Sequence, residues 1–582
     1  YIHVFFGGQG GMPKHGKNPL GNTHYGRNIH VVSTNPGDIT SFRYTNIMIH
    51  CMVGLMAALL LVRLLPLVGL SNASHLWVVV AIVSWWYFSP INVSTTLYVI
   101  QRMTQLASLF TLLGLYLFLC GRSCLLVNPK KGFALIAIGL FGCGTLAVLS
   151  KESGALIFVY ASIIEIAILQ RQRTPTPLTL KFILFIPLAA MSTYLLIELP
   201  NYLIGYEKRH FTMSERVLTE LRILADYIYR ITTSRINGMG LMHDDIQLST
   251  SLLSPIKTLY ALIFHVSVCI VAWNKRYKWP LFFLGVFWFY GGHCLESSFI
   301  PLELYFEHRN YMPSFGIIIA VVSLLAVYSV KKNITVPLLL LMIICAAFFC
   351  WQRSTLWGDP VRQMNTWVYE NPRSLRAQTI NARNLLRVGD YSNGLRQIEG
   401  VKSIWPEAVH IDFIKLNQVC LRNFSNDFDM GELETSIRNG KYYSQLDAVL
   451  EITYKLAIRQ ECPDLLGGNI HEITRHLYNL QGITRQTKAS IAFWKHEFYV
   501  ERRDLNGAMA ALEESFLFYP DSIPLYIQAK LMVEAGLYVQ SYEFIGMAIN
   551  NELAKPILKR KNIRAYQKFK SAVEAELIKS SS

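Results

Sequence analysis

The sequence predicts an all-α protein in which a polytopic helical membrane domain precedes a soluble domain of α-helical repeats. Hydrophobic residues make up 52% of the 582 residues, the mean hydropathy is +0.29, and the apolar runs are concentrated before about residue 352. From about residue 356 the pattern changes to amphipathic helices with polar faces. Apolar runs of membrane length followed by half-polar helices are typical of a membrane domain joined to a soluble one.

Residues 1–44 are polar and rich in glycine and histidine, and we expect them to form an extramembrane loop with little regular structure. No signal-peptide pattern opens the sequence at Tyr1. We therefore expect a first membrane helix, and the loop that follows it, to be missing upstream of Tyr1.

Ten apolar spans follow within the predicted membrane domain, residues 45–352. Several are shorter than the roughly 20 residues that a membrane-crossing helix needs. Some are therefore expected to be tilted, broken or re-entrant. The spans lie near residues 45–68, 76–92, 104–120, 133–150, 154–170, 180–199, 258–273, 279–293, 314–330 and 334–350.

Basic residues in alternate connections orient these spans. The positive-inside rule places those connections on the cytoplasmic face. They carry Arg122, Lys130, Lys131, Arg171, Arg173, Lys181, Lys275, Arg276, Lys278, Lys331 and Lys332. The opposite, outer face then receives residues 1–44, the segment 200–257 and everything after Trp351.

The formal net charge of +16 is scattered over short loops, which favours membrane topology and contact with anionic lipid or phosphate. No nucleic-acid partner is expected. The ten cysteines show no CxxC pair and no zinc spacing, and eight lie in or beside the spans. Cys420 and Cys462 lie in the soluble part, where they could form a disulfide.

An amphipathic helix is predicted from Ser214 to Ile236 in the outer segment. Ser214 could cap it, and it is expected to lie in the membrane interface or to enter the membrane briefly. Its apolar positions recur every three or four residues, at Val217, Leu221, Leu224, Ile228 and Ile231.

The soluble domain, residues 356–582, contains Pro372 and Pro406, which lie 34 residues apart. That spacing is the period of a tetratricopeptide repeat (TPR). Residues 420–485 depart from the pattern, so we predict a divergent TPR-like array. Stacked repeats of this kind usually leave a concave surface for a partner.

The line from Gly291 to Gly316 joins two spans and is unusually charged for a short loop. Ionisable groups at membrane depth are costly and usually functional. We expect this loop to line an active site, with a polar cap over the helical bundle as the alternative. Its charged and titratable residues include Glu296, Glu303, Glu307, His308 and Arg309.

Three further motifs fall on the outer face and could converge with Arg309. SPINVSTTLYVIQRM places one arginine at the start of a span, SKESG forms a tight turn, and MGLMHDD supplies three polar residues. Their candidate residues are Arg102, Lys151, Glu152, His243, Asp244 and Asp245.

Five motifs precede the repeat domain: SFRYTNIMIH, the three motifs above and the charged loop Gly291–Gly316. In this order they resemble the bacterial GT-C membrane glycosyltransferases that carry a C-terminal TPR domain. They are similar, more distantly, to the animal transmembrane-and-TPR protein O-mannosyltransferases. The resemblance covers nearly the whole chain, and it depends on five motifs in order because no single one is specific.

The resemblance implies sugar transfer, by an inverting displacement, from a polyprenyl-phosphate donor to a protein or glycan acceptor. It also implies a bacterial inner membrane with the repeats on the periplasmic side, where a pilin or another surface protein could be the acceptor. No cofactor is expected to be required. HDD, the one candidate for a divalent cation, is a weak metal signature.

Such a reaction needs cations to stabilise the departing lipid phosphate. Arg102, Lys151 and Arg309 are the candidates, because arginine and lysine both bind phosphate. The alternative for each is a side chain that snorkels to the interface. The stretch YGRNIHVVS around Arg27 resembles the Gly-Arg-containing part of the family's first outer loop, which implies a substrate contact there.

The reaction also needs a carboxylate to deprotonate the acceptor hydroxyl. The family's base is an acidic residue just after the first helix, and residues 1–35 contain none. We therefore expect the base upstream of Tyr1, because Asp38 lies in a turn-like NPGD. Glu307 is the best acid within the chain, although it could instead form a salt bridge between helix ends.

Two other classes of protein remain open from the sequence. An oligosaccharide ligase or polymerase would also work from a polyprenyl carrier at the outer face. A non-catalytic scaffold or transporter would use the repeats to assemble a surface complex, and the absence of an evident base favours it.

Overall fold

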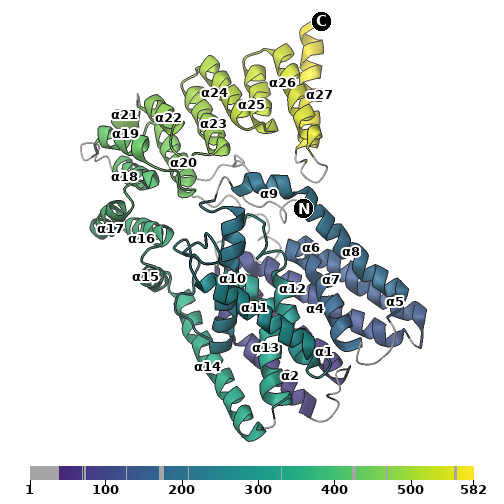
Figure 1. Cartoon of the computed structure of the whole chain (residues 1–582). Coiled ribbons are helices and arrows are strands. Elements are labelled where there is room, and N and C mark those ends of the chain that lie inside the picture. The colour runs from purple at the N-terminus through teal and green to yellow at the C-terminus, as the bar shows by residue number, and fades with distance from the viewer. Residues whose placement is uncertain are drawn as a thin grey trace. The chain divides into compact units, whose positions relative to one another are not determined.

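The computed structural model describes residues 39–67, 70, 74–125, 127–169, 176–206, 209–329, 331–421, 428–466, 469–555, 560 and 562–581. Helices make up the regular structure of these residues, and the only β-type pairing among them is isolated bridges at Lys441 (Figure 1). The predicted all-α class is confirmed for this part of the chain. The chain divides into two compact units, Tyr1–Ser374 and Leu375–Ser582.

The first unit holds the apolar helices. Its α-helices are α1 (Ile39–Leu67), α2 (Ser74–Tyr87), α3 (Val93–Leu97), α4 (Arg102–Cys124), α5 (Pro129–Ala137), α6 (Gly144–Ser150), α7 (Ile157–Ile164), α8 (Leu178–Ile197), α9 (Leu199–Gly205), α10 (Met213–Thr233), α11 (Lys257–Asn274), α12 (Pro280–His293), α13 (Pro313–Val322), α14 (Lys332–Gly358) and α15 (Pro360–Glu370). Shorter 3₁₀ and π turns lie between or extend them: η2 (Pro90–Asn92), η3 (Val99–Gln101), η4 (Ile138–Cys143), η5 (Glu152–Leu156), η6 (Glu165–Leu169), η8 (Glu307–Asn310) and η9 (Ser323–Val327).

Six helices in the described residues are long and apolar enough to cross a membrane, or seven if the bent pair His75–Tyr87 and Pro90–Leu97 is one span. The sequence predicted ten spans. The other three predicted spans form α7 with η6, α12, and α13 with η9, which are shorter. Nearly every residue of α12 and α13 is buried, so these helices form the centre of the unit rather than its outer surface.

Helices α12 and α13 can approach closely because glycines face each other between them. A Cβ atom added to Gly285 would lie 2.4 Å from the Gly316 carbonyl oxygen, and one added to Gly316 would lie 2.4 Å from the Gly285 carbonyl oxygen. Small residues at helix contacts allow such close packing in membrane proteins. The contact fixes the distance between α12 and α13, the two helices that the charged loop Gly291–Gly316 connects.

Replacing Gly285 by valine should therefore destabilise the first unit by about 1–3 kcal/mol, because the backbone of α13 must shift to admit the side chain. Thermal unfolding of the detergent-solubilised full chain measures this. Gly142→Val is the matched control, since its nearest neighbour would be 3.9 Å from the added Cβ. Equal melting of the two variants would show that the α12–α13 contact is not tight.

Helix α10 is the predicted outer helix, and its ends differ slightly from expectation. Thr212, rather than Ser214, is the N-cap, and it forms a reciprocal capping box with Glu215. The Glu215 side chain accepts a hydrogen bond from the Thr212 N–H at 2.8 Å, and the Thr212 hydroxyl accepts one from the Glu215 N–H at 3.3 Å.

The first unit extends beyond the predicted boundary near residue 356. Helix α14 continues to Gly358, and α15 follows it in the same unit. Trp367 of α15 is buried and lies edge-on to Trp357, with ring centroids 6.1 Å apart. These aromatic contacts attach α15 to α14.

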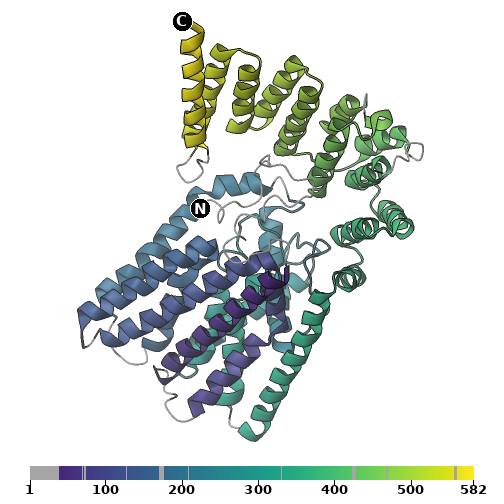
Figure 2. The same cartoon turned by 180° about the vertical axis from the view of Figure 1, so that it is seen from behind.

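In the second unit, helices that follow one another in the sequence also lie side by side and run in opposite directions (Figures 1 and 2). They are α16 (Leu375–Arg387), α17 (Tyr391–Ile404), α18 (Val409–Cys420), α19 (Met430–Asn439), α20 (Gln445–Ile458), α21 (Pro463–Leu466), α22 (Ile470–Leu477), α23 (Arg485–Glu501), α24 (Leu505–Phe518), α25 (Ser522–Glu534), α26 (Tyr538–Ala554) and α27 (Ile563–Ser581). A disulfide joins Cys420 and Cys462, the pair that the sequence left open.

Candidate functional site

A buried arginine of α10 holds the charged loop in place. Arg216 is 0% exposed and donates hydrogen bonds of 2.6–3.0 Å to the carbonyl oxygens of four loop residues. These residues are Glu296, Ser298, Leu302 and Glu303. Because a guanidinium group has five N–H donors in a rigid plane, one side chain can bind several carbonyls and fix the path of the loop.

Arg216 also forms a buried ion pair with Glu220, one turn further along α10, at 3.0 Å. Glu220 lies 3.9 Å from an Nη atom of Arg309 in the loop. Burial raises the pKa of Glu220 and lowers that of Arg216, since desolvation opposes both charges. The pair therefore depends on the loop carbonyls and on Arg309 to offset the cost of burial.

Two tyrosines complete the attachment of the loop. The Tyr227 hydroxyl of α10 donates to the Phe306 carbonyl oxygen at 3.0 Å and accepts from the Phe306 N–H at 2.9 Å. The Tyr206 hydroxyl donates to the Phe299 carbonyl oxygen at 2.7 Å. The loop thus has a defined shape although it contains little regular structure.

A small cavity of about 30 Å³, with charged side chains in its wall, lies where this loop meets α4, η5 and α7. Three charged side chains and one imidazole line it: Lys151, Glu296, Arg309 and His308. The Nζ atom of Lys151 lies 2.5 Å from a carboxylate oxygen of Glu296. Hydroxyl-bearing residues line the rest of its polar surface: Thr104, Ser108, Thr111, Ser153 and Tyr160.

The SKESG motif explains the position of Lys151. Helix α6 ends at Ser150, Lys151 is extended, and a 3₁₀ turn starts at Glu152. Gly154 permits this turn, because a Cβ there would lie 2.3 Å from the backbone of Ala147. The sharp turn places Lys151 in the cavity, whereas Glu152 next to it is exposed.

Opposing charges set the protonation states in the cavity. Burial by itself raises the pKa of the Glu296 carboxyl, but Lys151 and Arg309 outweigh burial and lower that pKa to about 2. Burial and the charge of Lys151 lower the pKa of His308 to about 3, although Glu296 opposes the shift. At neutral pH the cavity therefore holds two cations, one carboxylate and one neutral imidazole.

These pKa values predict that the folded protein loses stability as the pH falls. The unfolded chain would bind a proton on His308 below about pH 6.5 and on Glu296 below about pH 4.5, whereas the folded chain resists protonation until about pH 3 and 2. Both groups thus contribute stability above those unfolded-state values, and the contribution is lost as the pH falls. Melting temperatures from pH 8 to 4 should fall more steeply for the wild type than for His308→Asn; parallel curves would contradict this.

Glu307 lies apart from that cavity and is paired with Arg353 of α14 at 2.8 Å. His243 is 3.8 Å from the same carboxylate and packs on the Tyr305 ring. Burial raises the pKa of Glu307, but Arg353 and His243 outweigh it and lower the pKa to about 2. A carboxylate with so low a pKa is a weak general base, so the geometry favours the salt-bridge alternative for Glu307.

Other predicted residues do not converge on the cavity. Arg102 binds α1, through the Asn46 side chain at 2.8 Å and the Phe42 carbonyl oxygen at 3.2 Å. Glu303 pairs with Arg209 at 2.6 Å. The predicted meeting of all the outer-face cations is thus limited to Lys151 and Arg309.

The HDD motif is also separate. Asp244 accepts a hydrogen bond from the Ser374 hydroxyl, and Asp245 is exposed. Burial of part of the Asp245 side chain raises its pKa. Arg27 lies outside the described residues.

Sequence reasoning missed Arg216, Glu220 and Arg353. The predicted apolar face of α10 began at Val217, which is 44% exposed. The buried face instead runs through Arg216, Glu220, Ile223, Tyr227 and Ile231. The available signal was an Arg and a Glu four residues apart in register with apolar residues further along the same helix.

Comparisons with known proteins add only a short local likeness. No protein-family model and no solved structure match the chain. Segments match ulvan lyases from Alteromonas sp. (strain LOR), 60% identical over 42 residues, and Nonlabens ulvanivorans, 55% over 42 residues. A third match, to an ulvan lyase from Pseudoalteromonas sp. (strain PLSV), is 56% identical over 46 residues.

Each match covers 7–8% of this chain, and the chain spans 9% of the length of each lyase. A match of that length indicates neither the fold nor the activity of this chain. What the described residues establish is the class of protein: an all-helical chain with several helices that could cross a membrane and a charged cavity beside them.

Proposed function

We propose that this chain is a multi-pass membrane glycosyltransferase that moves a sugar from a polyprenyl-phosphate donor to a protein or glycan acceptor. The observation that carries the proposal is the cavity in which Lys151 and Arg309 lie among hydroxyl groups. Two cations and several hydrogen-bond donors suit a phosphate group. The apolar helices around the cavity suit the lipid to which the phosphate is attached.

Helix α4 supports this role. Thr104, Ser108 and Thr111 recur every three or four residues and line the cavity from one face of a helix long enough to cross a membrane. The Thr104 hydroxyl donates to the Gln101 side chain at 2.8 Å, and the Ser108 hydroxyl donates to the Thr104 carbonyl oxygen at 2.8 Å. In the proposed complex these hydroxyls would turn to donate to the phosphate of a lipid-linked sugar instead.

In the proposed reaction the acceptor oxygen attacks the anomeric carbon of the sugar and the bond from that carbon to the phosphate oxygen breaks. The acceptor proton passes to a base, and the lipid phosphate leaves with the bonding electrons. Lys151 and Arg309 stabilise the charge that grows on the departing phosphate. Glu296 orients Lys151, and neutral His308 can donate a hydrogen bond to phosphate or sugar.

Neither Glu296 nor Glu307 suits the role of base, because each is held by cations at a low pKa. The described cavity has cations but no evident base, and this observation favours the competing hypothesis of a non-catalytic scaffold. The transfer experiment distinguishes the two.

The remaining parts suit an outer-face enzyme of the bacterial inner membrane. A disulfide such as Cys420–Cys462 persists in oxidising compartments, which supports a periplasmic second unit. Its successive helix pairs support a TPR-like array that recruits the acceptor, for example a pilin or another surface protein.

The test is transfer by purified full-length protein, including any upstream coding sequence, with radiolabelled polyprenyl-phosphate mannose and a membrane extract as acceptor source. Wild-type protein should transfer label, and Arg309→Ala should not, while both melt as folded proteins. Lys130→Ala, at the predicted cytoplasmic end of α5, is the control and should remain active. Failure to transfer from mannose, glucose and N-acetylglucosamine donors alike would favour the scaffold.

A further inference from the structure

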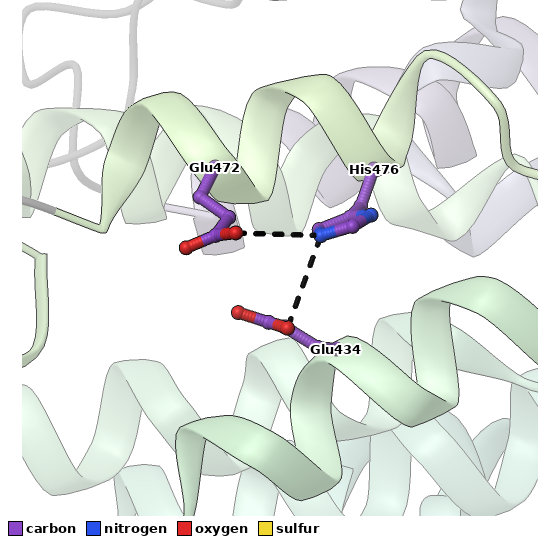
Figure 3. Close-up of side chains that lie close together, drawn as sticks. All are labelled: Glu434, Glu472 and His476. Carbon is purple, nitrogen blue, oxygen red and sulfur yellow. Dashed lines mark ion pairs between the residues drawn. The ribbon is translucent and has the colours of Figure 1, made fainter.

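We propose that Glu434, Glu472 and His476 in the second unit form a binding site for a divalent transition-metal ion of the zinc type. Figure 3 shows the three side chains pointing toward one another, with Glu434 on α19 and the other two on α22. The site belongs to the repeat unit alone. It is independent of the cavity and of sugar transfer.

The ligand atoms already lie close to a metal-binding arrangement. The Nε2 atom of His476 is 3.8 Å from an oxygen of Glu434 and 3.9 Å from an oxygen of Glu472, and all three ligand atoms lie within 4.8 Å of one another. Zinc bonds to nitrogen and oxygen of about 2.0–2.2 Å place neighbouring ligand atoms about 3.4 Å apart. Small rotations of the two glutamates, whose side chains are 30% and 49% exposed, would close the difference.

The histidine gives a second, independent indication. Its Nε2 atom is buried and makes no hydrogen bond within the part of the chain that the structure describes, while its side chain is only 12% exposed. A buried ring nitrogen without a hydrogen bond is uncommon. An ion between the imidazole and the two carboxylates would satisfy it.

The donor set selects the kind of ion. Calcium and magnesium prefer oxygen ligands alone, whereas an imidazole nitrogen with two carboxylate oxygens suits zinc and its neighbours. Three protein ligands leave a fourth position for water or another group. Glu472 and His476 are four residues apart and so share one face of α22.

Two arginines compete for the carboxylates. Arg475 lies 3.1 Å from the Glu472 oxygen, and Arg438 lies 3.9 Å from the Glu434 oxygen. Both arginines are more than half exposed, and exposed ion pairs contribute little free energy. A metal ion can therefore displace them. The alternative is that a protonated His476 simply pairs with both glutamates.

Bound metal would tie α19 to α22 across the segment in which Cys462 is held by its disulfide. Three ligands from two helices that are separated by more than thirty residues make a staple of the kind that small helical units use. The site would thereby stiffen the region in which the sequence departs most from a regular repeat.

The experiment is calorimetric titration of the detergent-solubilised full chain with zinc chloride. Because the chain has 15 histidines, the result is read as the difference between the wild type and the variants. We expect the wild type to bind one more equivalent, with micromolar affinity, than either His476→Gln or Glu434→Gln. Saturating zinc should also raise the melting temperature of the wild type but not of these variants.

His471→Ala is the matched control, since His471 lies on the same helix outside the cluster, and it should bind zinc as the wild type does. The same stoichiometry and affinity in wild type, His476→Gln and Glu434→Gln would overturn the proposal and leave an ion-pair cluster only. If His476→Gln fails to fold, Glu434→Gln decides, because the Glu434 side chain is 30% exposed and the glutamine keeps its size.

Discussion

Replacing Arg216 by methionine should destabilise the first unit by about 3–5 kcal/mol, the loss typical when one partner of a buried ion pair is removed. Methionine can fill the volume but cannot bind the four loop carbonyls, and Glu220 would keep its charge without its partner. The loop should lose its fixed path, so the lowered melting temperature should be accompanied by faster proteolysis between Gly291 and Gly316.

Arg222→Met is the control for that prediction. Arg222 lies on the same helix, is half-buried, and donates to the Gln247 carbonyl oxygen at 2.8 Å rather than to the charged loop. We expect it to cost about 1 kcal/mol and to leave proteolysis of the loop unchanged. If Arg216→Met melts and is cleaved like the wild type, α10 does not hold the loop.

Replacing Lys151 by methionine should reduce sugar transfer by about 100-fold to 1,000-fold, the range seen when one preorganised electrostatic donor is removed from an active site. Lys151 is the cation that the SKESG turn places in the cavity, and it is buried against Glu296. The effect should appear mainly in the rate of transfer, because the charge on the phosphate grows as the reaction proceeds.

Lys151→Met also leaves Glu296 without its cation, so loss of folding must be separated from loss of catalysis. The double variant Lys151→Met with Glu296→Gln removes both charges and should restore the melting temperature without restoring transfer. Recovery of transfer in the double variant would show that Lys151 is needed only to neutralise Glu296.

The class of fold and the helices that are apolar enough to cross a membrane could be predicted from the sequence, because an apolar run indicates burial or lipid contact. Which of the apolar runs form helices long enough to cross a membrane could not. Helices α12 and α13 are as apolar as the longer helices but are shorter and lie at the centre of the unit. Hydropathy does not distinguish a helix that meets lipid from one that meets other helices.

Most of the face that α10 buries was predicted one residue out of register, although Ile231 was predicted correctly. Periodicity assigns apolar residues to the buried side, and Val217 was counted there. The structure buries the charged Arg216 instead, because the neighbouring loop supplies carbonyl oxygens that Val217 could not bind. Only the three-dimensional path of a loop some eighty residues away provides that information.

The candidate site was predicted in part. Lys151 comes from the SKESG motif and Glu296, His308 and Arg309 from the loop Gly291–Gly316, and these side chains do line one cavity. Their roles in transfer stay a prediction. Glu307 could not be assigned from sequence, because its partner Arg353 lies in a helix that hydropathy marks as a plain apolar span.

The central claim is that this cavity binds a lipid-linked phosphate, and native mass spectrometry of the detergent-solubilised full chain with undecaprenyl phosphate tests it most directly. The account predicts one bound lipid on the wild type and on Lys130→Ala. It predicts little or none on the double variant Lys151→Met with Arg309→Met, under conditions where all three proteins remain folded. Equal occupancy on all three would contradict it.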